Sequence, residues 1–178
     1  MPTPTIRTAR PADAPACAQV MYDCWQGSYR GLLPAELVDA MSLERSLEMW
    51  TRSLADPRNA VFIAEAASSR PGPGPVLGVA SARLEDDAVG YIPSLYVSPA
   101  GQGRGVGRAL LWHAERHLAR AGAARGTLWV FEENLPSRAF YRRCGWEPDG
   151  RHLVLPEWGR PQIGLGKALG PGTATAQR

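Results

Sequence analysis

The pattern of hydrophobic and polar positions predicts a chain in which short strands alternate with amphipathic helices. Apolar runs and two-residue alternation, bounded by Gly, Pro and Asp, indicate the strands. The predicted strands are Thr5–Ala9, Ala60–Ala66, Val76–Leu84, Ala88–Val97 and Thr127–Val130, with strand-like pieces near Trp146, at His152–Leu155 and at Gln162–Leu169. Strands and helices in this order predict an α/β or α+β domain on a mixed sheet.

Helical spacing of apolar residues predicts the remaining regular elements. Asp13 can cap a helix whose apolar positions are Ala16, Val20, Met21 and Cys24. Further helices are predicted at Leu43–Leu54, from a glycine-rich turn to about Ala121, and at Pro136–Arg143. Trp25–Met41, rich in Trp, Tyr, Gly and Pro, predicts a broken pair of helices with a loop.

The long helix after the glycine-rich turn has an apolar side and a charged side. Its apolar ridge, with spacings of three or four, comprises Val106, Leu110, Ala114, Leu118 and Ala121. The charged side comprises Arg108, Glu115, Arg116 and Arg120. This amphipathic pattern predicts that the ridge faces the core and that the charges lie on the outer side.

The predicted elements fit a single domain. At 178 residues the chain is long enough for one domain with a substantial core, which we place at residues 1–169. Ala60–Ala66 and Val76–Leu84 are expected to pair as an antiparallel hairpin across the loop Ser68–Pro75. The small, polar tail 170–178 is expected to be disordered.

Composition argues against a membrane or secreted protein. Hydrophobic residues make up 44% of the chain, and no stretch approaches the roughly 18 uncharged apolar residues that a membrane helix requires. Met1–Arg10 lacks the apolar region of a secretory signal. A cytoplasmic location is therefore expected.

Charge and cysteine content narrow the possible partners. The formal charge is +3, but Lys167 is the only lysine and the arginines are scattered, so no nucleic-acid surface is predicted. A polyphosphate ligand satisfies the same charge. Cys17, Cys24 and Cys144 are odd in number and form no CxxC or Cys/His spacing, so we expect neither a disulfide framework nor a metal site.

The strongest chemical signal is the turn Ser98–Gly107. Glycines at 101, 103, 105 and 107 expose backbone N–H groups at a helix N-terminus, with no Cβ atoms to block approach. Such a turn attracts phosphate, and Arg104 and Arg108 can add charge-assisted contacts to the same anion. The alternative is a tight strand-to-helix connection that binds nothing.

Two common phosphate-binding motifs do not fit this turn. A P-loop requires GK[ST], which is absent. A Rossmann turn follows the first strand and has an acidic residue about 20 positions later. Here the turn lies in the second half of the chain, and the positions from 127 are Thr-Leu-Trp-Val.

Two blocks of sequence carry a family resemblance. Val97-x-Pro99-x-x-Gln102-Gly103-x-Gly105-Val106-Gly107-x-x-Leu110 resembles the acetyl-CoA pyrophosphate motif [RQ]-x-x-G-x-[GA] of the GNAT superfamily of N-acetyltransferases. Asn134-x-x-Ser137-x-x-Phe140-Tyr141-x-x-x-Gly145-Trp146 is similar to the second block of that family. The resemblance spans about Thr5–Leu169 and is specific between Leu95 and Trp146. It implies a mixed, mostly antiparallel sheet of about six to seven strands flanked by helices, splayed between the fourth and fifth strands.

The resemblance also implies acetyl-CoA as the cosubstrate and assigns its binding residues. The turn would bind the pyrophosphate through the backbone of Gln102, Gly103, Arg104, Gly105, Val106 and Gly107, with Arg108 beside it. Main-chain groups of Leu95 and Val97 would pair with pantetheine like an added strand, and Asn134 would touch the pantetheine arm.

Tyr141 would lie near the thioester sulfur as the general acid. An unperturbed phenol, with a pKa near 10, keeps its proton at neutral pH and can donate it to a thiolate with a pKa near 8.5. The alternative for Tyr141 is a core aromatic residue on a short helix.

The general base is not evident from the sequence. Many relatives place a Glu on the strand before the turn, where this chain has Tyr91, and Pro93 on the same strand is consistent with a bulge or splay. Glu85, Asp86 and Asp87 lie upstream and could act through water, or they form a solvated hairpin turn. We rank Glu85 ahead of Tyr91 as the candidate.

An aromatic pair is the candidate acceptor site. Trp25 and Tyr29 lie one helical turn apart in a segment that resembles the acceptor wall of bacterial relatives, and they could contact a cation or a flat amine. Core packing is the alternative for both. Glu36 and Asp39 could attract an ammonium, or they are ordinary surface charges.

These features predict an N-acetyltransferase that moves an acetyl group from acetyl-CoA to a primary amine of a small molecule or peptide. Direct transfer is preferred, because only Arg142 and Arg143 are near enough in sequence to activate Cys144 as an acyl carrier. The alternative function is a catalytically degenerate acyl-CoA sensor, which the absent strand carboxylate favours. We expect neither a nucleic-acid nor a membrane partner, and a homodimer is left open.

Overall fold

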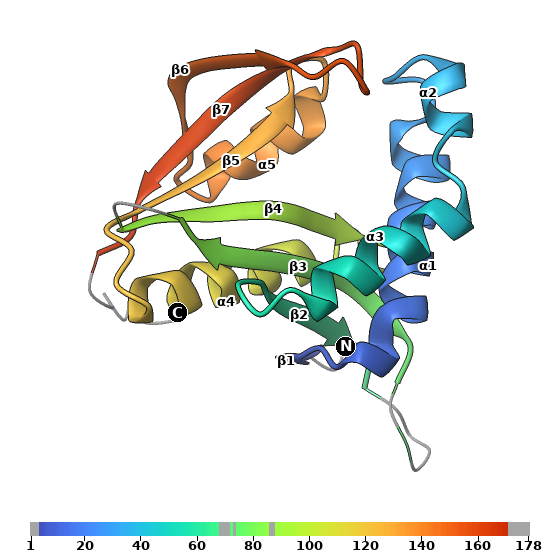
Figure 1. Ribbon diagram of the computed structural model, residues 1–178, viewed down its shortest axis with the longest axis horizontal. Helices are drawn as coiled ribbons and strands as arrows, with labels where there is room; N and C mark the ends of the chain where they lie inside the picture. The colour runs from blue at the N-terminus through green and yellow to red at the C-terminus, as the bar shows by residue number, and fades with distance from the viewer. Residues whose placement is uncertain (1–3, 68–71, 73, 86–87, 171–178) are drawn as a thin grey trace. The chain divides into compact units, whose positions relative to one another are not determined.

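The structure, a computed structural model, describes residues 4–67, 72, 74–85 and 88–170 of the chain. Its strands are β1 (Thr5–Thr8), β2 (Ala60–Glu65), β3 (Val76–Leu84), β4 (Val89–Val97), β5 (Arg125–Phe131), β6 (Glu147–Val154) and β7 (Pro161–Ala168). Its α-helices are α1 (Ala14–Cys24), α2 (Ala35–Asp39), α3 (Leu43–Ala55), α4 (Val106–Arg120) and α5 (Leu135–Arg143) (Figure 1). Short helical turns cover Pro11–Asp13 and Pro99–Gly101, and Trp25–Tyr29 is a π-helix.

The strands form a seven-stranded sheet in the order β1-β2-β3-β4-β5-β7-β6. The pairs β1–β2, β5–β7 and β6–β7 are antiparallel, whereas β4–β5 is parallel. The N–H of Ala66 donates to the carbonyl of Pro75 at 2.9 Å, as the predicted hairpin between β2 and β3 requires. The predicted mixed, mostly antiparallel sheet flanked by helices is therefore confirmed.

The pairing between β4 and β5 is short. It joins Val89 to Arg125, Gly90 to Gly126 and Tyr91 to Thr127, and it ends there. The part of β4 after Tyr91 contains Pro93, which has no N–H to donate to a ladder. This register agrees with the predicted splay between the fourth and fifth strands.

The chain divides into two compact units, and β3, β4 and α4 contribute residues to both. The first unit comprises residues 1–81 and 94–113, and the second comprises residues 82–93 and 114–178. The prediction of one domain over residues 1–169 stays a prediction. The predicted disorder of the tail concerns residues that, apart from Gly170, lie outside the described part of the chain.

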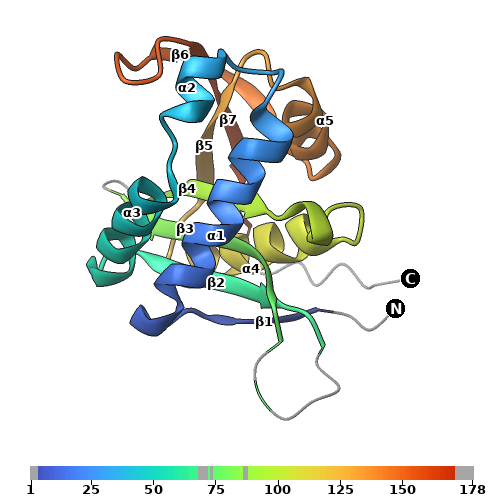
Figure 2. The same ribbon diagram turned by 90° about the vertical axis from the view of Figure 1, so that its right-hand side faces the viewer.

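In the first unit, helices cover both faces of the strands. The Phe62 ring of β2 packs against the His113 ring of α4, with centroids 4.8 Å apart. Glu65 points to the opposite face of β2, where Arg7 bonds both Glu65 at 2.7 Å and Asp13, just before α1, at 2.8 Å. Helices α1 and α3 pack against each other, as Figure 2 shows.

In the second unit, strands β5, β7 and β6 lie side by side (Figure 1). The Glu115 side chain is only 12% exposed, and it accepts hydrogen bonds from Trp146 Nε1 at 2.7 Å and from Lys167 Nζ at 2.8 Å. The expectation that Glu115 belongs to the outer, charged side of α4 was therefore wrong. A carboxylate can lie close to the core here because two charge-assisted donors satisfy it.

Element boundaries differ from the predictions mainly at strand ends. Strand β5 begins at Arg125 rather than Thr127, since pairing with β7 extends to Ala168. The pieces predicted near Trp146 and at His152–Leu155 belong to a single strand, β6, which is interrupted by a register shift between Pro148 and His152. The irregular helical character predicted for Trp25–Met41 is confirmed by the π-helix and the short α2.

Candidate functional site

The glycine-rich turn after β4 is fastened to β3. Both the N–H and the Oγ of Ser98 donate to the carbonyl of Leu77, at 2.9 and 3.1 Å. Gly101 is buried against the same carbonyl, and a Cβ at this position would lie 2.7 Å from that oxygen. The start of the turn is thus held by close backbone packing that only glycine allows at position 101.

The exposed part of the turn has backbone geometry suited to an anion. Gly103 and Gly105 have φ angles of +70° and +78°, a conformation that L side chains rarely adopt, and a Cβ at either would meet nothing within 4 Å. The N–H of Ala109 makes the bond to Gly105 O that opens α4, at 3.0 Å. The N–H groups of the residues just before Ala109 therefore have no acceptor within the helix, and the positive end of the helix dipole adds to them. This open cradle fits a pyrophosphate.

The charged side chains of the turn lie at the surface. Arg104 is exposed, and its Nη1 donates to the carbonyl of Ala100 at 3.3 Å, which folds the guanidinium back over the turn. Arg108 is exposed in the first turn of α4. Val106, in contrast, is 1% exposed and belongs to the core, so it can offer a ligand only its backbone.

The side chain of Gln102 connects the turn to the π-helix. Its Nε2 donates to Ser28 Oγ at 2.8 Å and to the carbonyl of Val97 at 3.1 Å. Ser28 in turn bonds the Cys24 thiol, whose pKa is raised to about 11 by burial, against the opposing effect of bonds to Ser28 and to the Val97 backbone. Sequence reasoning assigned Gln102 a backbone role and missed this link, which joins residues 74 positions apart.

The predicted acceptor residues are stacked. The rings of Trp25 and Tyr29 lie 5.0 Å apart at an interplanar angle of 17°. Trp25 is 2% exposed, so it acts as a buried platform for the half-buried Tyr29. Asp39 is paired with Arg30 at 3.0 Å, and Glu36 is exposed on α2.

Leu95 and Val97 lie on β4 beyond its pairing with β5, and both are half-buried. Backbone groups of a strand that has parted from its neighbour can accept a new extended partner. This location is compatible with the predicted pairing to pantetheine. The Val97 carbonyl already accepts the Gln102 side chain, and the Val97 backbone also bonds Cys24, so the remaining lone pair of that carbonyl is what a ligand could use.

The candidate bases lie together at the start of β4. Arg83 donates through Nε and Nη2 to Glu85 Oε1, at 3.2 and 2.9 Å, and its guanidinium lies 5.1 Å from the centre of the Tyr91 ring. Burial raises the pKa of Tyr91 above its usual 10.0, and the charge of Glu85 adds to this, while Arg83 and Arg151 oppose it. The phenol is therefore protonated at neutral pH. Asp86 and Asp87 lie outside the described residues.

The second predicted motif forms the start and middle of α5. Asn134 is 5% exposed, and its Oδ1 accepts the N–H of Ser137 at 3.1 Å, which makes it the N-cap of the helix. The Asn-x-Pro sequence signals such a cap, but sequence reasoning gave Asn134 only a ligand contact. Tyr141 is 8% exposed and packs edge-on against Phe140 and Trp146, with ring centres 5.2 and 6.3 Å away.

A cluster of charged side chains that the sequence did not predict covers one face of the second unit. The 5% exposed carboxylate of Asp149 accepts from Arg151 Nη2 at 2.7 Å and from Arg125 Nη2 at 3.3 Å. Burial raises the pKa of Asp149, but bonds from Arg151 and the charges of Arg151 and Arg125 outweigh it and bring the pKa below the usual value. The Arg151 guanidinium also lies 4.6 Å from the centre of the Trp129 ring.

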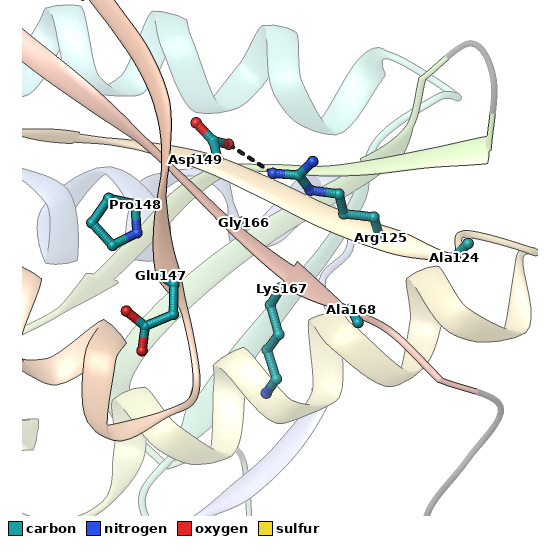
Figure 3. A pocket seen from close by; sticks show the side chains of 8 residues that line it. All are labelled: Ala124, Arg125, Glu147, Pro148, Asp149, Gly166, Lys167 and Ala168. Atoms are coloured by element: carbon teal, nitrogen blue, oxygen red, sulfur yellow. Dashed lines mark hydrogen bonds and ion pairs between the residues drawn. The ribbon is translucent and has the colours of Figure 1, made fainter.

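Next to this cluster is an open hollow of about 380 Å³. Figure 3 shows that Arg125 and Asp149 meet on one side of β7, whereas Lys167 points to the other side. The hollow is lined by Ala124, Arg125, Glu147, Pro148, Asp149, Gly166, Lys167 and Ala168, none of which is a predicted site residue. Arg125 and Lys167 are paired with the carboxylates of Asp149 and Glu115.

The described residues offer neither a cluster of metal ligands nor a membrane-spanning helix. Among residues 4–67, 72, 74–85 and 88–170, no group of three or more His, Cys, Asp and Glu side chains could hold a metal ion. Within the same ranges, no helix is both long and apolar enough to cross a membrane.

Known proteins resemble this chain in sequence and in fold. Residues 18–146 match the sequence model of the Acetyltransferase (GNAT) family. The aminoglycoside N(6')-acetyltransferase type 1 of Stenotrophomonas maltophilia is 35% identical over 156 residues, which cover 83% of this chain and 89% of that protein. A probable N-acetyltransferase of Mycobacterium tuberculosis is 31% identical, covering 82% and 81%. The PaiA N-acetyltransferase from Thermoplasma acidophilum, solved with coenzyme A, shares the fold with a TM-score of 0.73 at 19% identity, covering 94% and 99%.

Proposed function

Because the chain belongs to the acetyltransferase (GNAT) family, we propose that it transfers an acetyl group from acetyl-CoA to a primary amine of a small molecule or peptide. The acetyltransferase class predicted from the sequence is confirmed by the family assignment. The acceptor, the direct mechanism and the individual site residues are the parts that we propose.

The cradle of left-handed glycines at positions 103 and 105 is the observation that carries the donor assignment. Its backbone amides, together with Arg104 and Arg108, neutralise the pyrophosphate of acetyl-CoA. The parted segment of β4 at Leu95 and Val97 holds pantetheine by strand-like bonds, and Asn134 contacts the pantetheine arm.

The chain's own residues then handle protons during direct transfer. The amine nitrogen bonds to the acetyl carbonyl carbon, the carbon–sulfur bond breaks, and Tyr141 donates its phenolic proton to the departing thiolate. The ammonium gives up two protons in all. One passes to solvent before attack, and the other, lost from the nitrogen after attack, replaces the proton that Tyr141 gave to the thiolate. The products are an amide, free CoA thiol and one proton in solvent. The buried position of Tyr141 beside Trp146 favours a fixed orientation of that hydroxyl.

Water, positioned by Glu85, is the proposed route by which the incoming amine loses its proton. Tyr91 is a weaker candidate, because burial raises its pKa and keeps it protonated at neutral pH. Glu85 is 44% exposed and bonded to Arg83, so its carboxylate is held close to water. Tyr29, on its Trp25 platform, is the proposed aromatic contact for the acceptor.

The test is an acetyl-CoA consumption screen that detects free thiol, with aminoglycosides, polyamines, amino acids and peptide amino termini as acceptors. Turnover with at least one amine supports the enzyme. If no amine is acetylated while CoA still raises the melting temperature, the sensor function replaces it. Aminoglycosides are included because the relative from Stenotrophomonas maltophilia carries that name.

Two further aspects belong to the same proposal. A cytoplasmic location fits an enzyme that consumes acetyl-CoA, and fractionation of cells would test it. A homodimer remains a proposal that light scattering of the purified protein would decide.

A further inference from the structure

We propose that Arg83, beside the Tyr91 ring, and Arg151, on the Trp129 ring, bind an anionic group of the acceptor, so that the substrate is an amine that also carries a carboxylate. This inference rests on the proposed acetyltransferase function and deepens it by naming the substrate class. We call Tyr91, Arg83 and Arg151 the arginine face. All three residues belong to the second unit.

The first arm of the arginine face is built on consecutive strands. The guanidinium of Arg83, at the end of β3, lies 5.1 Å from the centre of the Tyr91 ring on β4. Its Nε and Nη2 both donate to Glu85 Oε1, which leaves the Nη1 edge without a protein acceptor among the described residues. Arg83 is 33% exposed, so that edge can be reached from solvent.

The second arm, Arg151, comes from β6, the edge strand of the sheet. Arg151 uses Nε and Nη2 for Asp149, at 2.9 and 2.7 Å, and its guanidinium stacks 4.6 Å from the centre of the Trp129 ring. The Nη1 edge again has no protein acceptor within the described residues, and the side chain is 42% exposed. A guanidinium fixed on an aromatic ring, with one edge open, is preorganised for a carboxylate.

The aromatic rings beside the two arms lie on paired strands, β4 and β5. The guanidinium of Arg83 lies over the Tyr91 ring, and the charges of Arg83 and Arg151 both oppose the rise that burial causes in the pKa of Tyr91. Tyr91 and Thr127 form the last pair of the β4–β5 ladder, and Trp129 follows on the same side of β5. The protonated phenol beside Arg83 adds a third hydrogen-bond donor for an anion.

Glycines of β7 make room for the second arm. A Cβ at Gly164 would lie 2.5 Å from Asp149 Oδ1 and 2.9 Å from Arg151 Nε, and a Cβ at Gly166 would lie 2.4 Å from Arg125 Nη2. Gly164 and Gly166 alternate along β7, so both open the same side of the strand. The side chains that hold Arg151 in place therefore lie directly on the sheet.

The place of the arginine face suggests that it meets the acceptor rather than acetyl-CoA. Tyr91 precedes Leu95 by four residues on β4. In the proposed function Leu95 and Val97 hold pantetheine, and the amine approaches the acetyl end of that arm. The open Nη1 edges can only donate hydrogen bonds, which a carboxylate accepts and an ammonium does not, so they favour an acceptor with a carboxylate over an aminoglycoside.

The experiment compares matched acceptors that differ only in the carboxylate, such as an amino acid and its amide. The amine of the amide is the less basic and more often neutral, so chemistry alone favours the amide. We expect the acid to have at least about tenfold higher kcat/KM, equivalent to one charge-assisted contact. The variants Arg83→Gln and Arg151→Gln should each reduce that preference severalfold and leave CoA affinity unchanged, whereas Arg151→Lys should keep part of it.

Arg58→Gln is the matched control, since Arg58 pairs with Asp56 in the first unit and should leave the preference intact. An amide or a polyamine that is used as well as the acid would overturn the proposal, as would an acid preference that survives both glutamine variants. Calorimetric titration of the CoA-loaded protein with the same pairs measures the preference without turnover. If the protein transfers no acetyl group but still binds the acid, and if this binding depends on Arg151, the proposed function is wrong and the anion site is retained.

Discussion

The glycine-rich turn after β4 and the arginine face are both suited to anions, but they are built from different parts of the chain. In the turn, the proposed binding groups are backbone amides and a helix dipole, and their geometry is set within about ten consecutive residues. In the arginine face, side chains from β3, β4 and β6 are brought together by strand pairing and by glycines on β7. A site made of backbone groups suits a ligand that is the same in every reaction, such as the cosubstrate. A site made of side chains can change its specificity through single substitutions.

The largest expected effect concerns the turn, at Gly105. Gly105→Glu should abolish measurable CoA binding, because it places an anion in the cradle and forces a side chain onto a φ of +78°. Gly105→Ala is the matched control, since it carries the same backbone strain, about 1–2 kcal/mol, without the charge. Isothermal titration with CoA distinguishes the two. Equal affinity of the Glu and Ala variants would contradict the phosphate assignment.

The next effect separates binding of acetyl-CoA from its chemistry. Tyr141→Phe should lower kcat by about 10²-fold or more, as loss of a general acid does, with little change in CoA affinity. The packing of the ring against Phe140 and Trp146 should persist, so the melting temperature serves as the folding control. Turnover at the wild-type rate would remove Tyr141 from the mechanism.

A smaller effect should follow from loosening the turn without touching its amides. Ser28→Ala removes the acceptor of the Gln102 hydrogen bond, which is 2.8 Å long in the structure. A lost hydrogen bond of about 0.5–1.5 kcal/mol corresponds to a CoA affinity roughly two- to tenfold lower. CoA titration measures this, and an unchanged dissociation constant would show that the π-helix does not support the turn.

The smallest effect concerns Tyr91 and pH. Because its pKa is raised above 10.0, chiefly by burial, Tyr91 is neutral through the range in which the amine loses its proton. The rise of kcat/KM with pH should therefore keep its position in Tyr91→Phe, even if binding of the acceptor weakens. If the rise of kcat/KM with pH shifts to another pH or disappears in Tyr91→Phe, Tyr91 is the base.

How much could be predicted from the sequence differs between the same two regions. The turn was located correctly, because glycine spacing and an amphipathic helix are local signals that hold for any tertiary context. The predicted sheet type and family were also confirmed. Both rested on the two sequence motifs, which are local signals and fix the order of β4, α4 and α5 along the chain. The roles of the individual site residues stay predictions.

The arginine face could not be predicted, because it depends on which strands pair and in which register. Arg151 reaches Trp129 only because β6 and β5 flank β7 and because the register shifts between Pro148 and His152. The inward position of Glu115 has a similar origin, since its partner Lys167 lies 52 residues away. Helical periodicity alone predicts that Glu115 lies on the outer side of α4. The ion pair with Lys167, which is distant in sequence, stabilises it in a nearly buried position instead.

The ion pair between Lys167 and Glu115 bears on whether acetyl-CoA can acetylate the protein itself. Acetyl-CoA at high local concentration modifies exposed amines without any catalyst, and Lys167 is the only side-chain amine of this chain. Its three N–H groups are matched by Glu115 Oε1, Glu115 Oε2 and the carbonyl of Cys144, at 2.8 to 2.9 Å. Acetylation of this nitrogen would break these contacts, so the single side-chain amine of the chain is placed where modification by acetyl-CoA is disfavoured.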